Sequence, residues 1–310
     1  MLFLKPIRHD TIWGGPKITR YTGVEGEHIG HLYSLYCRPG SSNEILNGPW
    51  QGRRLNDVFP LFRDEFAMGH CDFFPLTLAL TEADQNLSIQ VHPDDRMAAS
   101  LEPRSHGKRE SWYFIEAPES GTIINGCTCT DNRQMHTTIA DGRFLEMADT
   151  LKVAVGDYVF VEPGTLHAIT AGSLVYEIEE GSDHTYRFYD YDRRDADGNP
   201  RQLHVEEATQ ALHLGLKSRT RRYQAGHEIV ERTYATRLVA DTPQHTNLSG
   251  TLECFTLVAG HLVADGLAMQ PGSTAILWPG ETLRTHNVQL AFTARYSPLL
   301  PEEELAVRLS

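Results

Sequence analysis

The stretch Gly156-Asp-Tyr-Val-Phe-Val-Glu-Pro163-Gly164 decides the fold that we expect from this sequence. A glycine turn leads into a short apolar strand, and a Pro-Gly turn ends that strand. The pattern starts at 156 and again at 272, 116 residues later, as Gly272-Ser-Thr-Ala-Ile-Leu-Trp-Pro279-Gly280. The two stretches indicate an internal repeat. The offset places Leu283 where the first copy has His167, so the second copy is expected to keep the strand frame and lose the histidine.

Outward from this repeat, most of the chain consists of short apolar or alternating runs separated by Gly, Pro, Asn and Asp. Such runs are typical of all-β sandwiches and barrels. Helical spacing is confined to a few stretches, of which the clearest are Asp94–Leu101 and Val205–Leu216. We therefore predict an all-β chain with a few short helices. Its strands are expected to include Ser111–Ile115, Tyr158–Val161, Leu174–Ile178, Phe255–Val258 and Thr274–Trp278.

The repeat predicts two β-barrel domains, and a change in composition marks the boundary between them. Residues 216–225 are basic and polar and almost free of aliphatic side chains. We place the boundary there, which gives an N-terminal domain of residues 1–220 and a C-terminal domain of residues 221–310. An exposed loop inside one domain would explain the same composition. If the repeat is real, the chemistry belongs to the first copy.

Composition and charge exclude several classes of protein. The formal charge of −13 argues against nucleic acid as a partner, because such binding gains from neutralising phosphates with Lys and Arg. The sequence shows no apolar run long enough for a signal peptide or a membrane span. Five irregularly spaced cysteines do not read as a disulfide framework, which favours the cytoplasm. Cys127-Thr-Cys129 is interpreted as alternate residues of a strand, because no second cysteine pair completes a zinc set. Nothing in the sequence gives the oligomeric state.

The first stretch that could carry chemistry is Leu87-Ser-Ile-Gln-Val-His-Pro93. Alternate side chains of a strand share one face, so Ser88, Gln90 and His92 point the same way and the aliphatic residues point the other. Three polar residues backed by three aliphatic ones suit a polar site inside a barrel. A solvated strand face would show the same alternation.

Two further stretches offer ligand-type side chains. Lys108 and Glu110 share a face directly before an aromatic strand, and a carboxylate that enters a barrel needs a cation. His167 follows a Pro-Gly turn on a returning strand. Either stretch alone has an ordinary structural explanation, such as a surface Lys–Glu pair or an exposed histidine. Together with the first stretch they favour a metal site of imidazole, carboxylate and amide oxygen, which suits zinc, with iron and manganese as alternatives.

Downstream, Glu177 and Glu179 share a strand face and Arg187 follows. Guanidinium stays charged and offers forked donors, so Arg187 could hold a phosphate or a developing oxyanion. A salt bridge to Asp183 or Asp190 is the alternative. The sequence has no glycine-rich phosphate loop and no Gly-x-Ser-x-Gly elbow, which argues against nucleotide chemistry and serine hydrolysis.

These stretches form an ordered series: Leu87-Ser-Ile-Gln-Val-His-Pro-Asp-Asp95, Gly107-Lys-x-Glu-x-Trp-Tyr113, Pro163-Gly-Thr-x-His-Ala168 and Ser182-Asp-x-Thr-Tyr-Arg187. The series resembles the motifs of type I mannose-6-phosphate isomerases, in the short bacterial form of this cupin family. The opening Leu4-Lys-Pro and Ile12-Trp-Gly-Gly15 also match, as does Gly198-x-x-Arg201-x-Leu-His204, so the resemblance spans residues 2–215. It implies two cupin-type (jelly-roll) barrels, with the metal in the first.

The resemblance also implies the roles of individual residues. One zinc ion per chain would be held by Gln90, His92, Glu110 and His167. Arg187 would be catalytic, with Lys108 and Glu177 in the same pocket. Ser88 would lie near the substrate phosphate, and Lys108 and Arg187 would also bind the substrate. The implied substrate is a small hexose 6-phosphate, and the implied reaction interconverts mannose 6-phosphate and fructose 6-phosphate.

The sequence departs from the family pattern at three places. The usual lysine of the strand before the first motif is Ala79, the usual glutamates near Gly30 are His31 and Ser34, and the usual Gln-Gln after Glu177 is Glu179-Glu180. These departures keep open a cupin that binds a sugar phosphate without turnover. A metal-dependent oxygenase is a further alternative, because two histidines and a carboxylate would suit iron.

Overall fold

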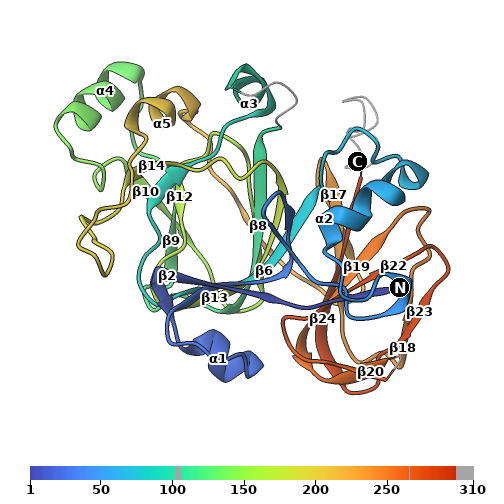
Figure 1. The fold of residues 1–310 in the computed structure, drawn as a ribbon. Helices are drawn as coiled ribbons and strands as arrows, with labels where there is room; N and C mark the ends of the chain where they lie inside the picture. Colours follow the sequence, from blue (N-terminus) through green and yellow to red (C-terminus); the bar gives the residue numbers. More distant parts are fainter. Residues whose placement is uncertain (102–105, 265, 298–310) are drawn as a thin grey trace.

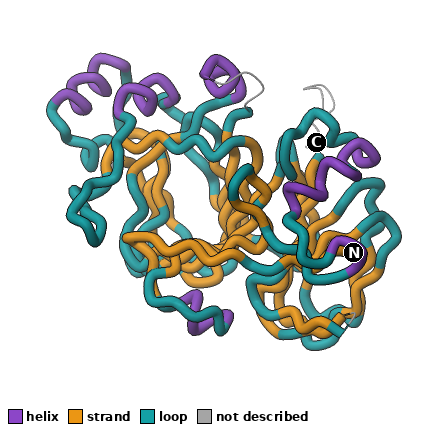
Figure 2. Tube along the Cα trace, viewed as in Figure 1, coloured by secondary structure: helices purple, strands orange, loops and turns teal. Residues whose placement is uncertain are grey.

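The fold is described from a computed structural model that places residues 1–101, 106–264 and 266–297. Two lobes are built mainly of strands, and the helices lie at their periphery (Figures 1 and 2). The prediction of an all-β fold with a few short helices is confirmed. Within the described ranges, no helix has both the length and the apolar character needed to cross a membrane.

The first lobe contains two antiparallel sheets. The larger sheet has strands β2 (Ile7–Gly15), β3 (Ile29–Leu35), β6 (Leu76–Ala83), β8 (Lys108–Glu116), β11 (Asp157–Val161), β13 (Ser173–Gly181) and β15 (Thr220–Arg222). The smaller sheet has β7 (Ile89–Val91), β9 (Thr122–Cys127), β10 (Ala148–Lys152), β12 (His167–Ala168) and β14 (Tyr186–Tyr189). Their strand orders are β15-β11-β8-β13-β6-β3-β2 and β10-β9-β12-β7-β14.

The second lobe is formed around a six-stranded antiparallel sheet. Its strands are β1 (Leu2–Leu4), β16 (Glu228–Val230), β17 (Tyr234–Val239), β19 (Glu253–Gly260), β22 (Thr274–Leu277) and β24 (Val288–Tyr296), in the order β1-β22-β19-β24-β17-β16. The pairs β18 (Gln244–Thr246) with β23 (Thr282–Arg284) and β20 (Leu262–Ala264) with β21 (Leu267–Met269) complete it. The N-terminal strand β1 therefore belongs to this lobe, and the predicted boundary between residues 220 and 221 falls inside β15. That boundary stays a prediction.

The helices are short, as expected. They are α1 (Lys17–Thr22), α2 (Leu55–Val58), α3 (Asp95–Leu101), α4 (Asn132–Ala140) and α5 (Val205–Ala211), and a small hairpin joins β4 (Cys37–Arg38) to β5 (Ser41–Ser42). In Figure 1, α3, α4 and α5 lie at one end of the first lobe. The helix predicted over Val205–Leu216 was too long. It ends at Ala211 because Leu212 adopts an extended conformation, with φ −70° and ψ 124°, and is buried in an apolar cluster.

The internal repeat is confirmed by the strand registers. In the first lobe Glu110 pairs with Val161, and in the second Glu253 pairs with Leu277, which lies 116 residues after Val161. Likewise His167 pairs with Gln90, and Leu283 pairs with His245. The second lobe thus has Glu253 at the position of Glu110, His245 at that of Gln90 and Leu283 at that of His167.

In the second lobe, two of these equivalent positions, His245 and Glu253, are joined by a hydrogen bond. The His245 Nε2 lies 2.6 Å from the Glu253 Oε1, and both side chains are almost buried. Asn247, two residues after His245 and so at the position of His92, donates its amide N–H groups to the backbone carbonyls of Thr251 and Leu277. These side chains are used to hold the second barrel together.

Strand β13 lies between the two lobes, and its side chains point alternately into one lobe and towards the other. Glu177 and Glu179 point into the first lobe, while Tyr176 and Ile178 join the apolar core shared with the second lobe. Tyr176 stacks on Phe292 of β24, with ring centroids 4.6 Å apart. One strand therefore carries polar side chains on the inner face and core side chains on the outer face, and its packing against the second lobe fixes where the polar ones lie.

Candidate metal centre

Ligand-type side chains from both sheets of the first lobe meet between them. On the smaller sheet, Gln90 of β7 lies directly opposite His167 of β12 on one side and Arg187 of β14 on the other. Residues directly opposite each other on neighbouring strands share a face, so these three form a row across the sheet. His92 follows β7 on the same face, and Glu110 comes from β8 of the larger sheet. The three separate stretches singled out in the sequence therefore converge.

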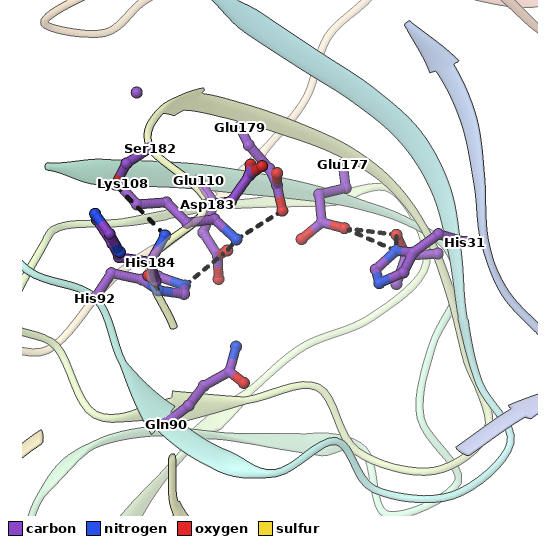
Figure 3. Close-up of polar contacts among 12 residues, drawn as sticks. His31, Gln90, His92, Lys108, Glu110, Glu177, Glu179, Ser182, Asp183 and His184 are labelled. Carbon is purple, nitrogen blue, oxygen red and sulfur yellow. Dashed lines mark hydrogen bonds and ion pairs between the residues drawn. The ribbon is translucent and has the colours of Figure 1, made fainter. Parts of the chain in front are cut away.

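The distances bring four of these side chains around one point. The His92 Nε2 lies 3.0 Å from the Glu110 Oε2, and the His167 Nε2 lies 3.1 Å from the Glu110 Oε1. Ligand atoms of these three residues all lie within 4.8 Å of one another, and all three residues are buried. The amide nitrogen of Gln90 lies 3.3 Å from the His167 Nε2. In Figure 3, Gln90 lies below Glu110 and Lys108, and its amide end points towards them.

The outer hydrogen bonds place an N–H on the Nδ1 of both imidazoles, so that the Nε2 atom of each ring faces this point. His92 donates its Nδ1–H to the carbonyl of His184 at 2.9 Å, and His167 donates its Nδ1–H to the carbonyl of Thr165 at 2.8 Å. Burial, with help from nearby Lys108, lowers the pKa of His92 to about 4, so its ring is neutral at pH 7. A neutral ring with its proton on Nδ1 has an unprotonated Nε2.

The Nε2 atoms of both imidazoles therefore face a buried carboxylate, and a cation between these three groups would bind all of them. The Glu110 Oε1 receives no hydrogen bond from any described residue. Histidine ligands usually donate their second N–H to a carbonyl or carboxylate, as both rings do here. An amide end offers oxygen or nitrogen, depending on its rotation, so Gln90 can complete the set. These residues fit a divalent metal ion.

Lys108 lies beside this cluster as a charged group. Its Nζ is 2.7 Å from the Glu179 Oε1 and 3.4 Å from the Glu110 Oε2. Burial alone would lower the pKa of Lys108, but Glu179, Glu110 and Glu177 outweigh burial and raise it. A second cluster of carboxylates lies beside the first and consists of Glu110, Glu177 and Glu179. The Lys108 ammonium supplies the positive charge within it (Figure 3).

Glu177 is held by donors on both of its oxygens. Thr81 of β6 donates its hydroxyl to the Oε2 at 2.5 Å, and Trp112 of β8 donates its indole N–H to the Oε1 at 3.0 Å. Burial, together with the charges of Glu179 and Glu110, raises the pKa of Glu177 to about 8. A carboxyl group with a pKa in this range can both accept and release a proton near neutral pH.

The predicted face of the first stretch is correct, since the Ser88 hydroxyl donates to the Gln90 Oε1 at 3.0 Å. Arg187 lies at the end of the same row. The salt bridge considered for it is not formed, because Asp183 pairs with Arg38, and Asp190 pairs with two other arginines, Arg193 and Arg201.

Among the described residues, the Arg187 guanidinium has no hydrogen-bond or ion-pair partner, and its Nε is buried. Burial, with Arg201 nearby, lowers its pKa, but guanidinium stays charged at any ordinary pH. An unpaired, half-buried guanidinium is a ready partner for an anion.

Each of the three departures places one residue at this site, whereas the Ser34 hydroxyl donates to the backbone carbonyl of Leu78. Ala79 faces Glu177 on one neighbouring strand and Tyr33 on the other, so a small side chain takes the lysine position. His31 lies next to Glu177 (Figure 3), with its Nδ1 3.7 Å from the Glu177 Oε2. Glu179 binds Lys108, whereas Glu180 points outward.

Sequence reasoning missed two residues of the site, Thr81 and Trp112. Both follow from strand alternation. Thr81 is two residues beyond Ala79, and Trp112 is two residues beyond Glu110, so each shares a face with a residue already singled out. The carbonyl of His184, which orients His92, gave no signal in the sequence because any residue supplies it.

Comparisons with known proteins show what this chain is similar to. No protein-family model matches the chain. The chain is 35% identical over 240 residues to mannose-6-phosphate isomerase ManA of Bacillus subtilis strain 168, which covers 77% of this chain and 75% of that protein. It is 34% identical over 216 residues to the mannose-6-phosphate isomerase of Streptococcus mutans, covering 69% and 68%.

The fold is shared with a solved member of this group. The crystal structure of the mannose 6-phosphate isomerase from Bacillus subtilis matches with a TM-score of 0.81 at 27% identity, covering 95% of this chain and 99% of that chain. The expectation of cupin-type barrels is thereby confirmed. Both sequence relatives are more than 30% identical to this chain over at least two thirds of their length. Together with the structural match, this shows that the chain belongs to the mannose-6-phosphate isomerase family.

Proposed function

We propose that this chain is a cytoplasmic, zinc-dependent isomerase that interconverts mannose 6-phosphate and fructose 6-phosphate. The observation that carries the proposal is the convergence of Gln90, His92, Glu110 and His167, from separate strands, on one buried point beside Lys108 and Glu177. Imidazole, carboxylate and amide ligands suit zinc, and one such set per chain suits one ion. The five cysteines are free thiols, which fits a reducing compartment.

Substrate binding is assigned to the two positive charges and one hydroxyl on this face. Arg187 has no partner within the described chain, so its fork is available to an anionic oxygen, of the phosphate or of the reacting sugar. Ser88 lies two residues from Gln90 and next to the same row. Lys108 already neutralises two carboxylates, so its role is to hold negative charge that develops near the metal ligands.

The reaction moves a proton between C1 and C2 of an open-chain sugar through an enediol. When bound, zinc supplies a Lewis acid that stabilises the negative charge of this step, worth several kcal/mol. Glu177 is our candidate for the group that accepts and returns the proton, because one of its carboxyl oxygens lies within 4.8 Å of a Glu110 oxygen and its pKa is raised to about 8 by burial and by neighbouring carboxylates. Trp112 and Thr81 fix its orientation through hydrogen bonds.

The test is a coupled assay of mannose 6-phosphate conversion by the chain loaded with zinc. His167→Ala removes one buried ligand and should abolish both bound zinc and turnover. His286→Ala, in the second lobe, is the control and should change neither. Full activity of His167→Ala would refute the site. Bound iron and oxygen consumption would favour an oxygenase, and bound zinc with phosphate-dependent stabilisation but no turnover of any hexose phosphate would favour a binding protein.

A further inference from the structure

A chain of hydrogen bonds leads away from Glu177 on the side opposite the metal ligands. The Thr81 hydroxyl lies 2.5 Å from the Glu177 Oε2 and 2.9 Å from the His31 Nδ1. Thr81 is fully buried, and His31 is largely buried. Thr81 is thus the link between a carboxyl group that faces the site and a histidine that stands behind it.

The surroundings of His31 fix both its charge and its place. Its ring stacks on Tyr33, with centroids 5.1 Å apart, and meets the edge of Trp13 at 5.0 Å. Burial, followed by His9 and Lys108, lowers the pKa of His31 to about 3. The ring is therefore neutral at pH 7 and carries a single N–H, and its aromatic neighbours hold it in one position.

The direction of the chain follows from the donors available. A carboxylate only accepts hydrogen bonds, so the single proton of the Thr81 hydroxyl must point to Glu177 when that group is ionised. The Thr81 oxygen then accepts from the His31 Nδ1–H. Because a hydroxyl can rotate, Thr81 without this donor could turn its proton elsewhere. The His31 donor thereby favours the orientation in which Thr81 donates to the ionised Glu177.

We propose that Thr81 and His31 are positioning residues for Glu177, which hold its carboxylate in the orientation needed to exchange a proton with the substrate. The inference rests on the proposed function and deepens it, because neither residue touches the metal ligands. The adjacent Ala79 leaves the near side of Glu177 without a charged neighbour on β6, so the carboxylate depends on Thr81, Trp112 and Lys108 for its interactions.

The experiment uses the zinc-loaded full chain with a matched set of variants. Thr81→Val removes the hydroxyl and keeps the shape, whereas Thr81→Ser keeps the hydroxyl. Thr77→Val is the control: Thr77 lies on the same face of β6, is buried, and its hydroxyl has no hydrogen-bond partner within the described residues. Each variant is measured for kcat, KM, bound zinc and melting temperature.

A hydrogen bond to a charged group is worth enough to change a rate by about ten- to a hundredfold. We expect kcat of Thr81→Val to fall by about this factor, with KM within about twofold. Bound zinc should stay at the wild-type level, and Thr81→Ser should restore most of kcat. Thr77→Val should keep kcat. Equal kcat in Thr81→Val and wild type, or an equal loss in Thr81→Val and Thr81→Ser, would overturn the proposal.

A second pair of variants tests His31. His31→Phe keeps the stacking on Tyr33 and removes the donor, and His31→Asn restores an N–H donor near the position of Nδ1. We expect kcat to fall in His31→Phe and to recover in part in His31→Asn. If both variants lose the same activity, His31 acts through packing alone and its part of the proposal is wrong.

One measurement separates this inference from the proposed function. The side-chain carboxyl carbon of Glu177 is followed by ¹³C NMR in the zinc-loaded protein, with Glu177→Gln to assign the signal. Loss of the donor in Thr81→Val should shift the signal, and Thr81→Ser should return it. A wild-type chain that turns over no hexose phosphate disproves the proposed function. An unchanged Glu177 signal in Thr81→Val disproves the positioning by Thr81.

Discussion

Replacing Lys108 by methionine should destabilise the protein in a way that depends on pH. The Lys108 ammonium lies 2.7 Å from Glu179 and 3.4 Å from Glu110, and all three side chains are close to fully buried. Methionine keeps the length of the side chain and removes its charge. The variant leaves buried carboxylates without the cation that neutralises them. Leaving a buried charge unpaired is one of the few single changes expected to lower the free energy of unfolding by several kcal/mol.

The magnitude follows from these distances. With an effective dielectric constant of about 20, the attractions are about 6 kcal/mol at 2.7 Å and about 5 kcal/mol at 3.4 Å. Much of this attraction energy offsets the cost of taking the charges out of water. Removing one partner of a buried pair therefore lowers the free energy of unfolding by about 3–5 kcal/mol rather than by the full attraction. The loss is partly relieved when Glu179 takes up a proton. Burial already raises its pKa, and the variant lacks Lys108, which opposes that rise.

The sign of the pH dependence is determined by this protonation. A carboxyl group with a pKa higher in the folded than in the unfolded chain stabilises the fold at low pH, and that stability is lost as pH rises through the folded pKa. We therefore expect Lys108→Met to lose about 3 kcal/mol at pH 8 and clearly less at pH 6. One extra bound proton changes the free energy of unfolding by about 1.4 kcal/mol per pH unit.

The assay is urea unfolding of the metal-free chain at pH 6 and pH 8. Lys5→Met serves as the control, because the Lys5 side chain is 64% exposed and its contact with Glu44 is 4.0 Å long; it should change stability by less than about 0.5 kcal/mol at both values. A loss below about 1 kcal/mol at pH 8 in Lys108→Met, or the same loss at both pH values, would refute the assignment of Lys108 as the cation of this buried group.

Three further changes test other parts of the structure. Arg187→Met should leave the melting temperature within a few degrees, because the guanidinium has no partner to lose, but it should lower kcat/KM for mannose 6-phosphate by at least about a hundredfold, as checked in the coupled assay. His245→Leu should lower the free energy of unfolding by about 2 kcal/mol by leaving the buried Glu253 carboxyl without its hydrogen-bond partner, without changing bound zinc. Glu177→Gln should flatten the loss of stability between pH 6 and pH 9, since the wild-type carboxyl has its pKa raised to about 8; an unchanged slope in urea unfolding contradicts this.

The sequence predicted most of the fold because its signals are local. Turn glycines, the Pro-Gly pairs and strand alternation are each set by a few neighbouring residues, and they placed Gln90, Glu110 and His167 on strands correctly. The register of the repeat was also accessible, since the 116-residue offset between Val161 and Leu277 appears directly in the strand pairing.

What could not be predicted depends on contacts between distant segments. The pairing of β1 with β22 joins the first residues of the chain to the second lobe, and no local pattern reveals it. The outer hydrogen-bond partners of His92 and His167 are backbone carbonyls, which leave no mark in the sequence. The freedom of Arg187 is likewise visible only once Asp183 and Asp190 are seen to be occupied by other arginines.

The second lobe packs against the outer face of the strands that carry the site, through three specific contacts. Tyr234 donates its hydroxyl to Ser111 at 2.8 Å, which is the residue next to Glu110. Thr233 donates to Glu180 at 2.8 Å, next to Glu179. Tyr176, next to Glu177, stacks on Phe292.

Each of these contacts acts on the outward-facing neighbour of an inward-facing polar residue. Because adjacent residues of a strand point to opposite faces, fixing the outer one fixes the inner one. The side chains of a functional site must be held within about half an ångström of the productive geometry. Contacts from the second lobe help to hold them there. The second barrel, in which His245 and Glu253 bind each other at the positions equivalent to Gln90 and Glu110, contributes rigidity to β8 and β13.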